Sequence, residues 1–312
     1  MQQLMSSKPM VALVGLWTAL LSLSQPAAAQ PGCQTQTAYN PIAADYPMNI
    51  TGVANGTLFL MPLSRDIATS LLPKGFTFVD DAYLRQSGWR ATDSIPLLGR
   101  AVYVNDIRSP DDMWRRPYSV VSIELPFVDA LHDGKTPFRF VHAQFIQTGI
   151  PNYAIDVATQ YGVPHIIPSV FDPECDAYDY QQRTGSTRGQ EALRAIPADG
   201  SGRAVDVVAP RQLTREARPF ATDGLKQMAM QPRFGMGSEG MVCGRTTVLY
   251  GKQVGFEEVV ETKGSVSFAG DFTGLAALKG AGIRSETVYG IRAGSAFIDA
   301  DFVSCQTLEY DI

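Results

Sequence analysis

The sequence is short of histidine and cysteine and has no excess of basic residues, and each shortage excludes a class of function. Only three histidines and four cysteines occur among 312 residues. Because there is no Cys-x-x-Cys pair, and no histidine pair has a common ligand spacing, no metal is expected. The weaker alternative is a site built from His132, His142 and His165 with nearby carboxylates. With 26 Lys and Arg against 31 Asp and Glu, nucleic acid is not expected as a partner.

The sequence also lacks several catalytic and architectural signatures. It contains no Gly-x-Ser-x-Gly elbow, no phosphate-binding loop and no fixed repeat. Residues 235–240 match Gly-x-Gly-x-x-Gly, but a dinucleotide fingerprint needs a strand before it and a helix after it. Since residues 241–250 favour a strand, we interpret the match as a glycine-rich turn. No cofactor is therefore expected.

A long apolar run occurs once, at residues 10–24. Lys8 precedes this run and Ala27-Ala28-Ala29 follows it, which is the pattern of a secretory signal peptide over residues 1–29. A membrane anchor would need about 20 apolar residues and no cleavage site. We expect a secreted mature protein, extracellular or in the lumen of the secretory pathway, that begins at Gln30 and has no membrane partner.

Secretion changes how the cysteines are interpreted. An even number of dispersed cysteines in an oxidising compartment favours two disulfides, with three possible pairings of Cys33, Cys175, Cys243 and Cys305. The sequence does not choose among them; the preferred pairing joins Cys33 to Cys305, which ties the termini, and Cys175 to Cys243. The sequons at Asn49 and Asn55 predict N-glycans near the mature N-terminus.

Most of the mature chain has the pattern of a β protein, with runs of branched and aromatic residues separated by Gly, Pro or Asp. Helices are predicted at Ser64–Leu72, with Ser64 as the cap, and at Asp271–Leu278. Residues 172–235 contain few apolar residues and are interpreted as long connections around one or two short strands. No linker divides residues 30–312, so we expect a single domain. The predicted strands are Thr57–Met61, Arg100–Val104, Ser119–Leu125, Phe138–Ile146, Arg245–Tyr250, Phe256–Glu261 and Ala296–Val303.

His142 and Gln144 stand out on their predicted strand. Strict alternation places both on one face with Phe138, Phe140 and Ile146. Polar groups set into an apolar wall are typical of small-molecule pockets. Burial with satisfied hydrogen bonds is the equally supported alternative.

The order of segments between residues 57 and 303 resembles the acetoacetate decarboxylase-like superfamily. Leu58–Pro73 with the following Lys-Gly-Phe is similar to the family's opening strand, short helix and turn. Pro117-Tyr118 resembles the strand that carries the family's Tyr-x-Glu. Phe140–His142 resembles the strand that follows it. Ala154–Pro164 resembles the family's segment that ends in aromatic-Gly-x-Pro. Residues 237–303 resemble the C-terminal half of the family's fold.

The resemblance implies an α+β fold, mainly antiparallel β: a closed β-cone or barrel with a central apolar cavity and a few outer helices. Family members decarboxylate β-keto acids through a Schiff-base lysine whose pKa is lowered by a second lysine. This chain departs from that pattern, because His165 and Ile166 stand where the lysine pair would be, and Val120 stands where the family has Glu. Imidazole cannot replace a primary amine in an imine.

We therefore predict a secreted small-molecule enzyme that acts without a Schiff-base lysine on a β-keto or polyketide-like substrate, in secondary metabolism. His165 is the candidate catalytic acid or base, with a pKa lowered by partial burial. The reaction would be a lyase- or isomerase-type enolisation, dehydration, cyclisation or decarboxylation. A non-catalytic binder of an apolar small molecule and a structural surface protein are the alternatives. The candidate substrate-binding residues are Tyr118, His142, Gln144 and Tyr161.

Overall fold

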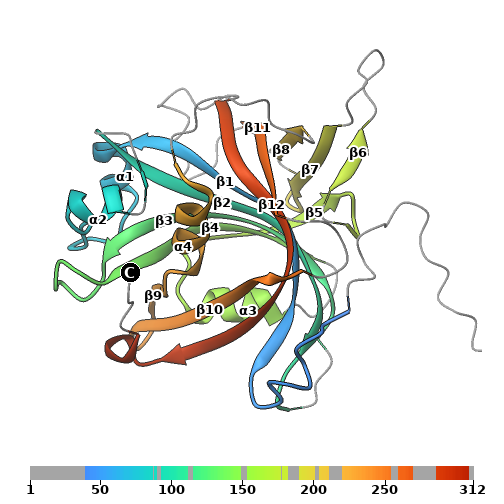
Figure 1. Cartoon of the computed structure of the whole chain (residues 1–312), viewed down its shortest axis with the longest axis horizontal. Helices are drawn as coiled ribbons and strands as arrows, with labels where there is room; N and C mark the ends of the chain where they lie inside the picture. The colour runs from blue at the N-terminus through green and yellow to red at the C-terminus, as the bar shows by residue number, and fades with distance from the viewer. Residues whose placement is uncertain are drawn as a thin grey trace, which may run out of the picture. The chain divides into compact units, whose positions relative to one another are not determined.

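The part of the chain that the structure describes is dominated by twelve strands joined in one sheet (Figure 1). This computed structural model describes residues 39–86, 88–89, 93–111, 115–148, 153–176, 178–181, 190–200, 204–210, 220–253, 259–269 and 286–308. Residues 32–312 make up one compact unit. None of the helices described here is long and apolar enough to cross a membrane.

Many of the strands are long, because branched and aromatic residues recur throughout them. They are β1 (Ile50–Ser64), β2 (Ser94–Arg108), β3 (Tyr118–Asp129), β4 (Pro137–Gln147), β5 (His165–Asp172), β6 (Asp179–Gln181), β7 (Gln190–Pro197), β8 (Ala204–Pro210), β9 (Arg233–Gly237), β10 (Gly240–Gln253), β11 (Val260–Ala269) and β12 (Glu286–Val303). The helices are α1 (Arg65–Ser70), α2 (Asp81–Gln86), α3 (Tyr153–Gln160) and α4 (Thr222–Met230), followed near the end by a 3-10 turn, η1 (Cys305–Thr307).

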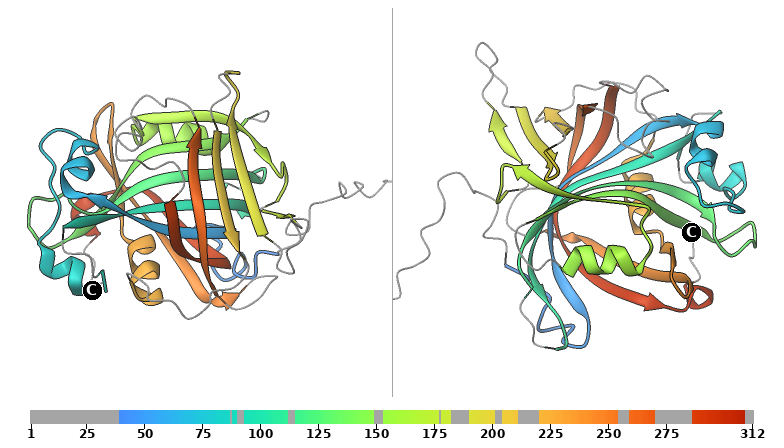
Figure 2. Two further views of the ribbon diagram at one scale, coloured as in Figure 1. Left: turned by 90° about the horizontal axis from the view of Figure 1, so that it is seen from above. Right: turned by 180° about the vertical axis from the view of Figure 1, so that it is seen from behind.

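Two closed rings of strands share β12, β1, β2, β3 and β4 (Figures 1 and 2). One edge of β12 pairs with β1; its other edge pairs with β11 in its first half and with β10 in its second. One edge of β4 likewise pairs with β5 near its end and with β9 near its start. The larger ring is completed by β5, β7, β8 and β11, and the smaller by β9 and β10. The expected closed, mainly antiparallel barrel is confirmed.

The two faces of the shared sheet have different chemistry, and the register shows which residues belong to each. Partners directly opposite one another across a sheet project to the same side. Phe59, Gly99 and Ile123 form one such row, on the side of the main apolar core. The neighbouring row, Leu58, Arg100 and Ser122, projects to the opposite side and is partly polar.

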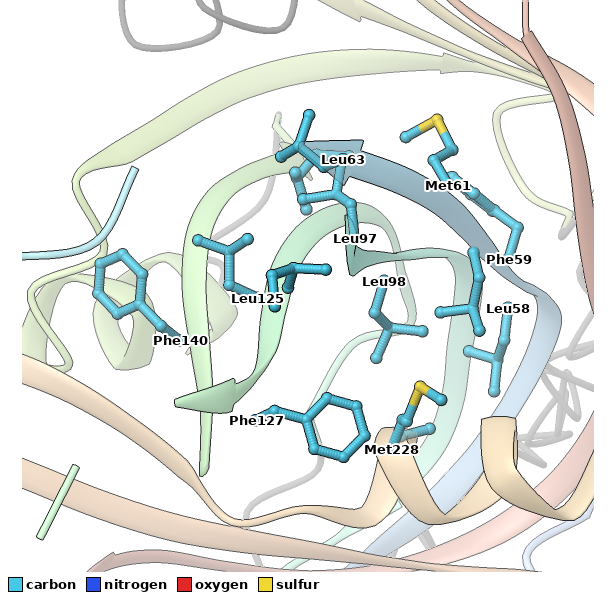
Figure 3. Close-up of a cluster of buried hydrophobic side chains, with 14 of the residues drawn as sticks. Leu58, Phe59, Met61, Leu63, Leu97, Leu98, Leu125, Phe127, Phe140 and Met228 are labelled. Carbon is cyan, nitrogen blue, oxygen red and sulfur yellow. The ribbon is translucent and has the colours of Figure 1, made fainter. Parts of the chain in front are cut away.

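Helix α4 packs on the polar side through apolar residues. Met228 of α4 and Phe127 of β3 lie beside Leu58 and Leu98 (Figure 3), and all four are buried. This packing fills one end of the smaller ring. The remainder of that ring is where open space is found, as described below.

Most predicted elements are present, and the exceptions are specific. The predicted helix at Ser64–Leu72 is α1, but Ser64 makes no side-chain capping hydrogen bond. The Gly-x-Gly-x-x-Gly match lies in the β9–β10 hairpin, which confirms the turn interpretation. Residues 172–235 contain more regular structure than expected, because β7 and β8 complete the larger ring. The predicted helix Asp271–Leu278 and the first half of the predicted strand Phe256–Glu261 lie outside the described residues.

The preferred disulfide pairing is wrong: Cys243 is bonded to Cys305. The register explains the bond, because Cys243 of β10 lies opposite Val303 of β12, two residues before Cys305. Cys175 is also disulfide-bonded, and Cys33 lies outside the described residues.

Of the two sequon asparagines, Asn55 is buried in the middle of β1, with 5% exposed. Asn49 is partly exposed at the start of the first strand. Glycosylation at either residue stays a prediction.

Candidate active site

Helix α3 lies across the smaller ring from the shared sheet (Figure 2). A cavity lies between α3 and the polar side of that sheet. It contains roughly 640 Å³ of space free of protein atoms, part of it open to solvent. Apolar side chains from β3, β4 and α3 make up much of its wall. Its polar lining residues are Tyr118, Gln144, Tyr153, Tyr161, Arg233, Asp299 and Asp301.

Helix α3 is positioned over the cavity by two glycines that allow close backbone contact. Gly162, just after the helix, has a φ of +65°, and a Cβ there would lie 2.0 Å from the carbonyl oxygen of Met236. A Cβ on Gly235 would lie 1.9 Å from the carbonyl oxygen of Tyr161. The end of α3 therefore lies directly against β9, and Tyr161 is brought to the cavity wall.

A hydrogen-bonded network of five residues lies along one side of the cavity, and four of the five line it. The Arg233 guanidinium bridges two carboxylates, with Nη2 2.9 Å from Asp299 Oδ1 and 2.6 Å from Asp301 Oδ1. The Tyr161 hydroxyl donates to Asp301 Oδ1 at 2.9 Å. Thr246 Oγ1 donates to Asp299 Oδ1 at 2.7 Å. Two carboxylates share one guanidinium, so these three groups carry a net charge of −1 when all of them are ionised.

The proton affinities in this network follow from its burial. Burial raises the pKa of Asp301, the Arg233 guanidinium opposes that rise, and Asp299 reinforces it, so the pKa of Asp301 lies above its ordinary value. Burial also raises the pKa of Tyr161 and of Tyr118, and both phenols stay protonated. The two carboxylates hold the pKa of Arg233 well above its ordinary value, although burial opposes them.

Tyr118 and Gln144 reach the same cavity from two neighbouring strands. Gln144 of β4 lies directly opposite Ser122 of β3, and Tyr118 lies four residues before Ser122 on the same face. Three of the four predicted substrate-binding residues, Tyr118, Gln144 and Tyr161, thus line one cavity. Their role in substrate binding stays a prediction.

The predicted catalytic histidine lies elsewhere. His165 pairs with Ala143, which lies opposite Ile123, so it projects to the side of the apolar core, whereas Ile166 pairs with Gln144. Its ring lies 4.9 Å from that of His142, edge to face. Neither histidine is among the residues that line the cavity. Partial burial lowers the pKa of His165, in the expected direction.

The expected alternation along β4 is wrong at His142. Ala143 pairs with Ile123 and Val141 pairs with Glu124, so His142 is an extra residue in a β-bulge. The bulge shifts the alternation, so that Arg139 and Val141 project to the same side of the sheet as Gln144. The His142 ring nitrogen Nδ1 lies 3.1 Å from the carbonyl oxygen of Leu71, beyond the end of α1.

Sequence reasoning missed Arg233, Asp299 and Asp301. A signal was present, since two acidic residues two apart on a predicted strand share one face. They were overlooked because nothing in the sequence shows that β9 would bring an arginine to them. Also missed was a buried ion pair, Glu124 with Arg139, to which Arg100 contributes at 3.7 Å.

The described cavity walls contain no lysine. Within the described residues, no group of three or more His, Cys, Asp or Glu is arranged to hold a metal ion. The groups available for chemistry in this cavity are therefore carboxylates, phenols, an amide and a guanidinium.

Comparison with family models and with curated proteins found no match. Several solved structures are similar in outline, among them the following two. The enduracididine biosynthesis enzyme MppR, complexed with the condensation product of pyruvate and imidazole 4-carboxaldehyde, matches at 11% identity over 88% of this chain and 98% of that one, with a TM-score of 0.44. An acetoacetate decarboxylase-like enzyme from Sphingomonas wittichii RW1 matches at 11% identity over 83% and 93%, with a TM-score of 0.46. The chain is thus structurally similar to acetoacetate decarboxylase-like enzymes over most of its length, at low sequence identity.

Proposed function

We propose that the cavity beneath α3 is the active site of a small-molecule enzyme that performs acid–base chemistry on a carbonyl substrate without forming an imine. The observation that carries the proposal is the hydrogen bond from Tyr161 to Asp301 in the cavity wall, where Arg233 and Asp299 complete the network. A buried carboxylate with a raised pKa, facing a cavity, is the usual arrangement of a catalytic acid or base.

The simplest reaction that these groups support is enolisation. Ionised Asp301 accepts the proton from the carbon next to the carbonyl, the C–H electron pair forms the C=C bond, and the carbonyl oxygen takes up negative charge. The Tyr118 hydroxyl, from β3, and the Gln144 amide, from β4, supply hydrogen-bond donors that stabilise that oxygen. Return of the proton from Asp301 to another carbon would complete an isomerisation. Transfer of that proton to a β-hydroxyl group, which leaves as water while the enolate electrons form a Cα=Cβ bond and the carbonyl re-forms, would complete a dehydration.

The cavity lining favours a substrate of low charge. Val120, Val141, Ile146 and Val157 lie beside the polar groups. Arg233, the one arginine among the described wall residues, is already bridged to two carboxylates. A β-keto or polyketide-like compound combines an acidic carbon with a largely apolar body and fits this lining. We propose secretion of the mature protein from Gln30 as the setting in which it acts.

His165 is the second candidate for proton transfer. The observation that favours it is its lowered pKa beside His142, which leaves a neutral imidazole able to accept a proton. Since its register places it on the other side of the sheet, it would serve a substrate reaching the apolar side. Substitutions at Asp301 and at His165 therefore distinguish two locations for the chemistry.

The test measures exchange of α-hydrogens of 2-pentanone and of a β-keto ester in deuterated water by NMR. Asp301→Asn should lower the protein-catalysed exchange by about 100-fold or more, the usual contribution of a general base. His165→Gln and the control Asp223→Asn, at an exposed carboxylate of α4, should leave it unchanged. Loss of exchange in His165→Gln but not in Asp301→Asn would move the chemistry to His165. Absence of catalysis in the wild type, with ketone binding retained, would favour a binder.

Borohydride reduction tests the absence of an imine. Because no lysine lies in the described cavity walls, treatment with borohydride in the presence of a ketone should leave the mass of the protein unchanged. A stable adduct mapped to any lysine would overturn lysine-independent catalysis.

A further inference from the structure

A second cavity lies in the smaller ring, between α4 and strands β1, β2, β10 and β12. It contains roughly 360 Å³ of space free of protein atoms, part of it open to solvent. Its described lining shares no residue with the cavity beneath α3. Its lining residues are Ala54, Gly56, Leu58, Arg100, Val102, Ala229, Val248, Tyr250, Ala293 and Ser295.

Three polar atoms of this lining are buried and have no hydrogen-bond partner. Arg100 Nε, the Tyr250 hydroxyl and Ser295 Oγ are all in this condition. A buried donor without a partner is costly and uncommon in a folded protein. Three such groups on the wall of one cavity indicate that a ligand with hydrogen-bond acceptors completes them.

The charge around the cavity indicates that the ligand is an anion. Arg100 and Arg139 share one buried carboxylate, Glu124, so this cluster has one positive charge in excess. Arg139 is fully buried, and Arg100 is largely so, with 17% of its side chain exposed. Burial lowers the pKa of Arg139 to about 10; Glu124 opposes that fall, and the guanidinium groups of Arg100 and Arg233 add to it.

We propose that this cavity binds a small carboxylate with a short aliphatic tail. The carboxylate accepts hydrogen bonds from Arg100 Nε, Tyr250 and Ser295, and its charge balances the two arginines. The remaining lining is small and aliphatic and matches the tail. Inorganic phosphate can accept the same hydrogen bonds, but it has no aliphatic group to contact the apolar part of the lining.

The test compares three probes on the full-length mature protein at pH 7: isobutyrate, its neutral analogue isobutyramide, and inorganic phosphate. Binding is measured by ligand-detected NMR and by the rise in melting temperature. Isobutyrate should bind more tightly than the other two. Equal binding of isobutyramide would overturn the requirement for charge, and equal or tighter binding of phosphate would overturn the aliphatic tail.

Two conservative variants separate binding from folding. Tyr250→Phe and Ser295→Ala each remove one hydroxyl, and each should weaken isobutyrate binding about tenfold. Because neither hydroxyl has a partner in the free protein, neither variant should lower the melting temperature without ligand. Unchanged affinity in both variants would overturn the site.

A third variant keeps this proposal distinct from the proposed active site. Tyr118→Phe alters the cavity beneath α3 and does not touch the second one, so it should leave isobutyrate binding unchanged. Weaker isobutyrate binding in Tyr118→Phe, with normal binding in Tyr250→Phe, would place the carboxylate in the first cavity and overturn the second site. Asp301→Asn, which should lose ketone exchange, is expected to bind isobutyrate as the wild type does.

Discussion

At the scale of single residues, the smaller ring is unusual in the charges it buries. Glu124 and Arg139 have 1% and 0% of their side chains exposed. Burial opposes ionisation of Glu124, but Arg139, Arg100 and the hydroxyl of Ser122 outweigh it, so the pKa of Glu124 lies below its ordinary value. Such a cluster is stable only while every member is present, because each removal leaves an uncompensated charge.

Glu124→Gln should therefore lower the free energy of unfolding by about 3–5 kcal/mol, since it leaves Arg139 and Arg100 buried together without a carboxylate. Denaturant unfolding at pH 7 measures this change. The control is Glu239→Gln, an exposed residue of the β9–β10 turn, for which no loss is expected. A loss at position 124 no larger than that of the control would contradict the buried cluster.

Glu124 also makes the free energy of unfolding depend on pH. Because the pKa of Glu124 is lowered on folding, its contribution is complete above its ordinary value of 4.5 and is lost as the pH falls below that value toward the folded-state pKa. Unfolding curves between pH 7 and pH 3 should show a steeper acid-side loss in the wild type than in Glu124→Gln. Parallel curves for the two proteins would show that Glu124 is not held ionised by folding.

At the scale of elements, the position of α3 determines whether the first cavity exists. The helix has only eight residues, too few to be stable without packing. It lies on the face of β4, and its end is held against β9 by the close approaches at Gly162 and Gly235. Tyr161 follows the helix directly, so the geometry of this junction sets the hydrogen bond to Asp301.

Gly162→Ala tests the junction, and Gly200→Ala is a matched control. Both glycines have a positive φ, +65° and +69°, but only at Gly162 would a Cβ meet another chain segment. Gly200→Ala should cost about 1–2 kcal/mol for backbone strain. Gly162→Ala should cost about 1–3 kcal/mol more because of the clash, and should also lower ketone exchange. Equal unfolding free energies for the two variants would contradict the close contact.

At the scale of the whole molecule, the two rings are possible because β12 is long enough to pair with different neighbours along one edge. The disulfide between Cys243 and Cys305 joins β10 to the segment that follows β12. It therefore links the smaller ring to the C-terminal end of the described chain. Cys175 belongs to a second bond.

The intact mass of the purified protein tests the predicted leader and the disulfides together. The mature chain should begin at Gln30, because the small-residue cleavage site ends at Ala29. Reduction should add the mass of about four hydrogens. Thiol labelling of the native protein should find no reactive cysteine. A retained leader would contradict the cleavage site, and two or more native thiols would contradict the second disulfide.

Local patterns in the sequence were sufficient for much of the fold. The runs at Arg100–Val104 and Phe138–Ile146 are strands because branched and aromatic residues prefer a pleated, half-buried surface. The helix after Ser64 ends before Pro73 for reasons that concern neighbouring residues only. The order of segments led to the barrel-like fold, to Tyr118 and to Tyr161, and the alternation along the predicted strand led to Gln144. All three residues line one cavity.

Only the tertiary structure decided which side of the sheet each group reaches and which distant groups meet. One extra residue, His142, reverses the alternation along β4, and the register with β5 then places His165 on the apolar side. Strand pairing brings Arg233 to Asp299 and Asp301, 66 and 68 residues away. Chain composition and periodicity determined that strands would form, because those preferences are local. The register, the bulge and the pairing of distant strands depend on the energy of the whole sheet, and these decided where the chemistry can take place.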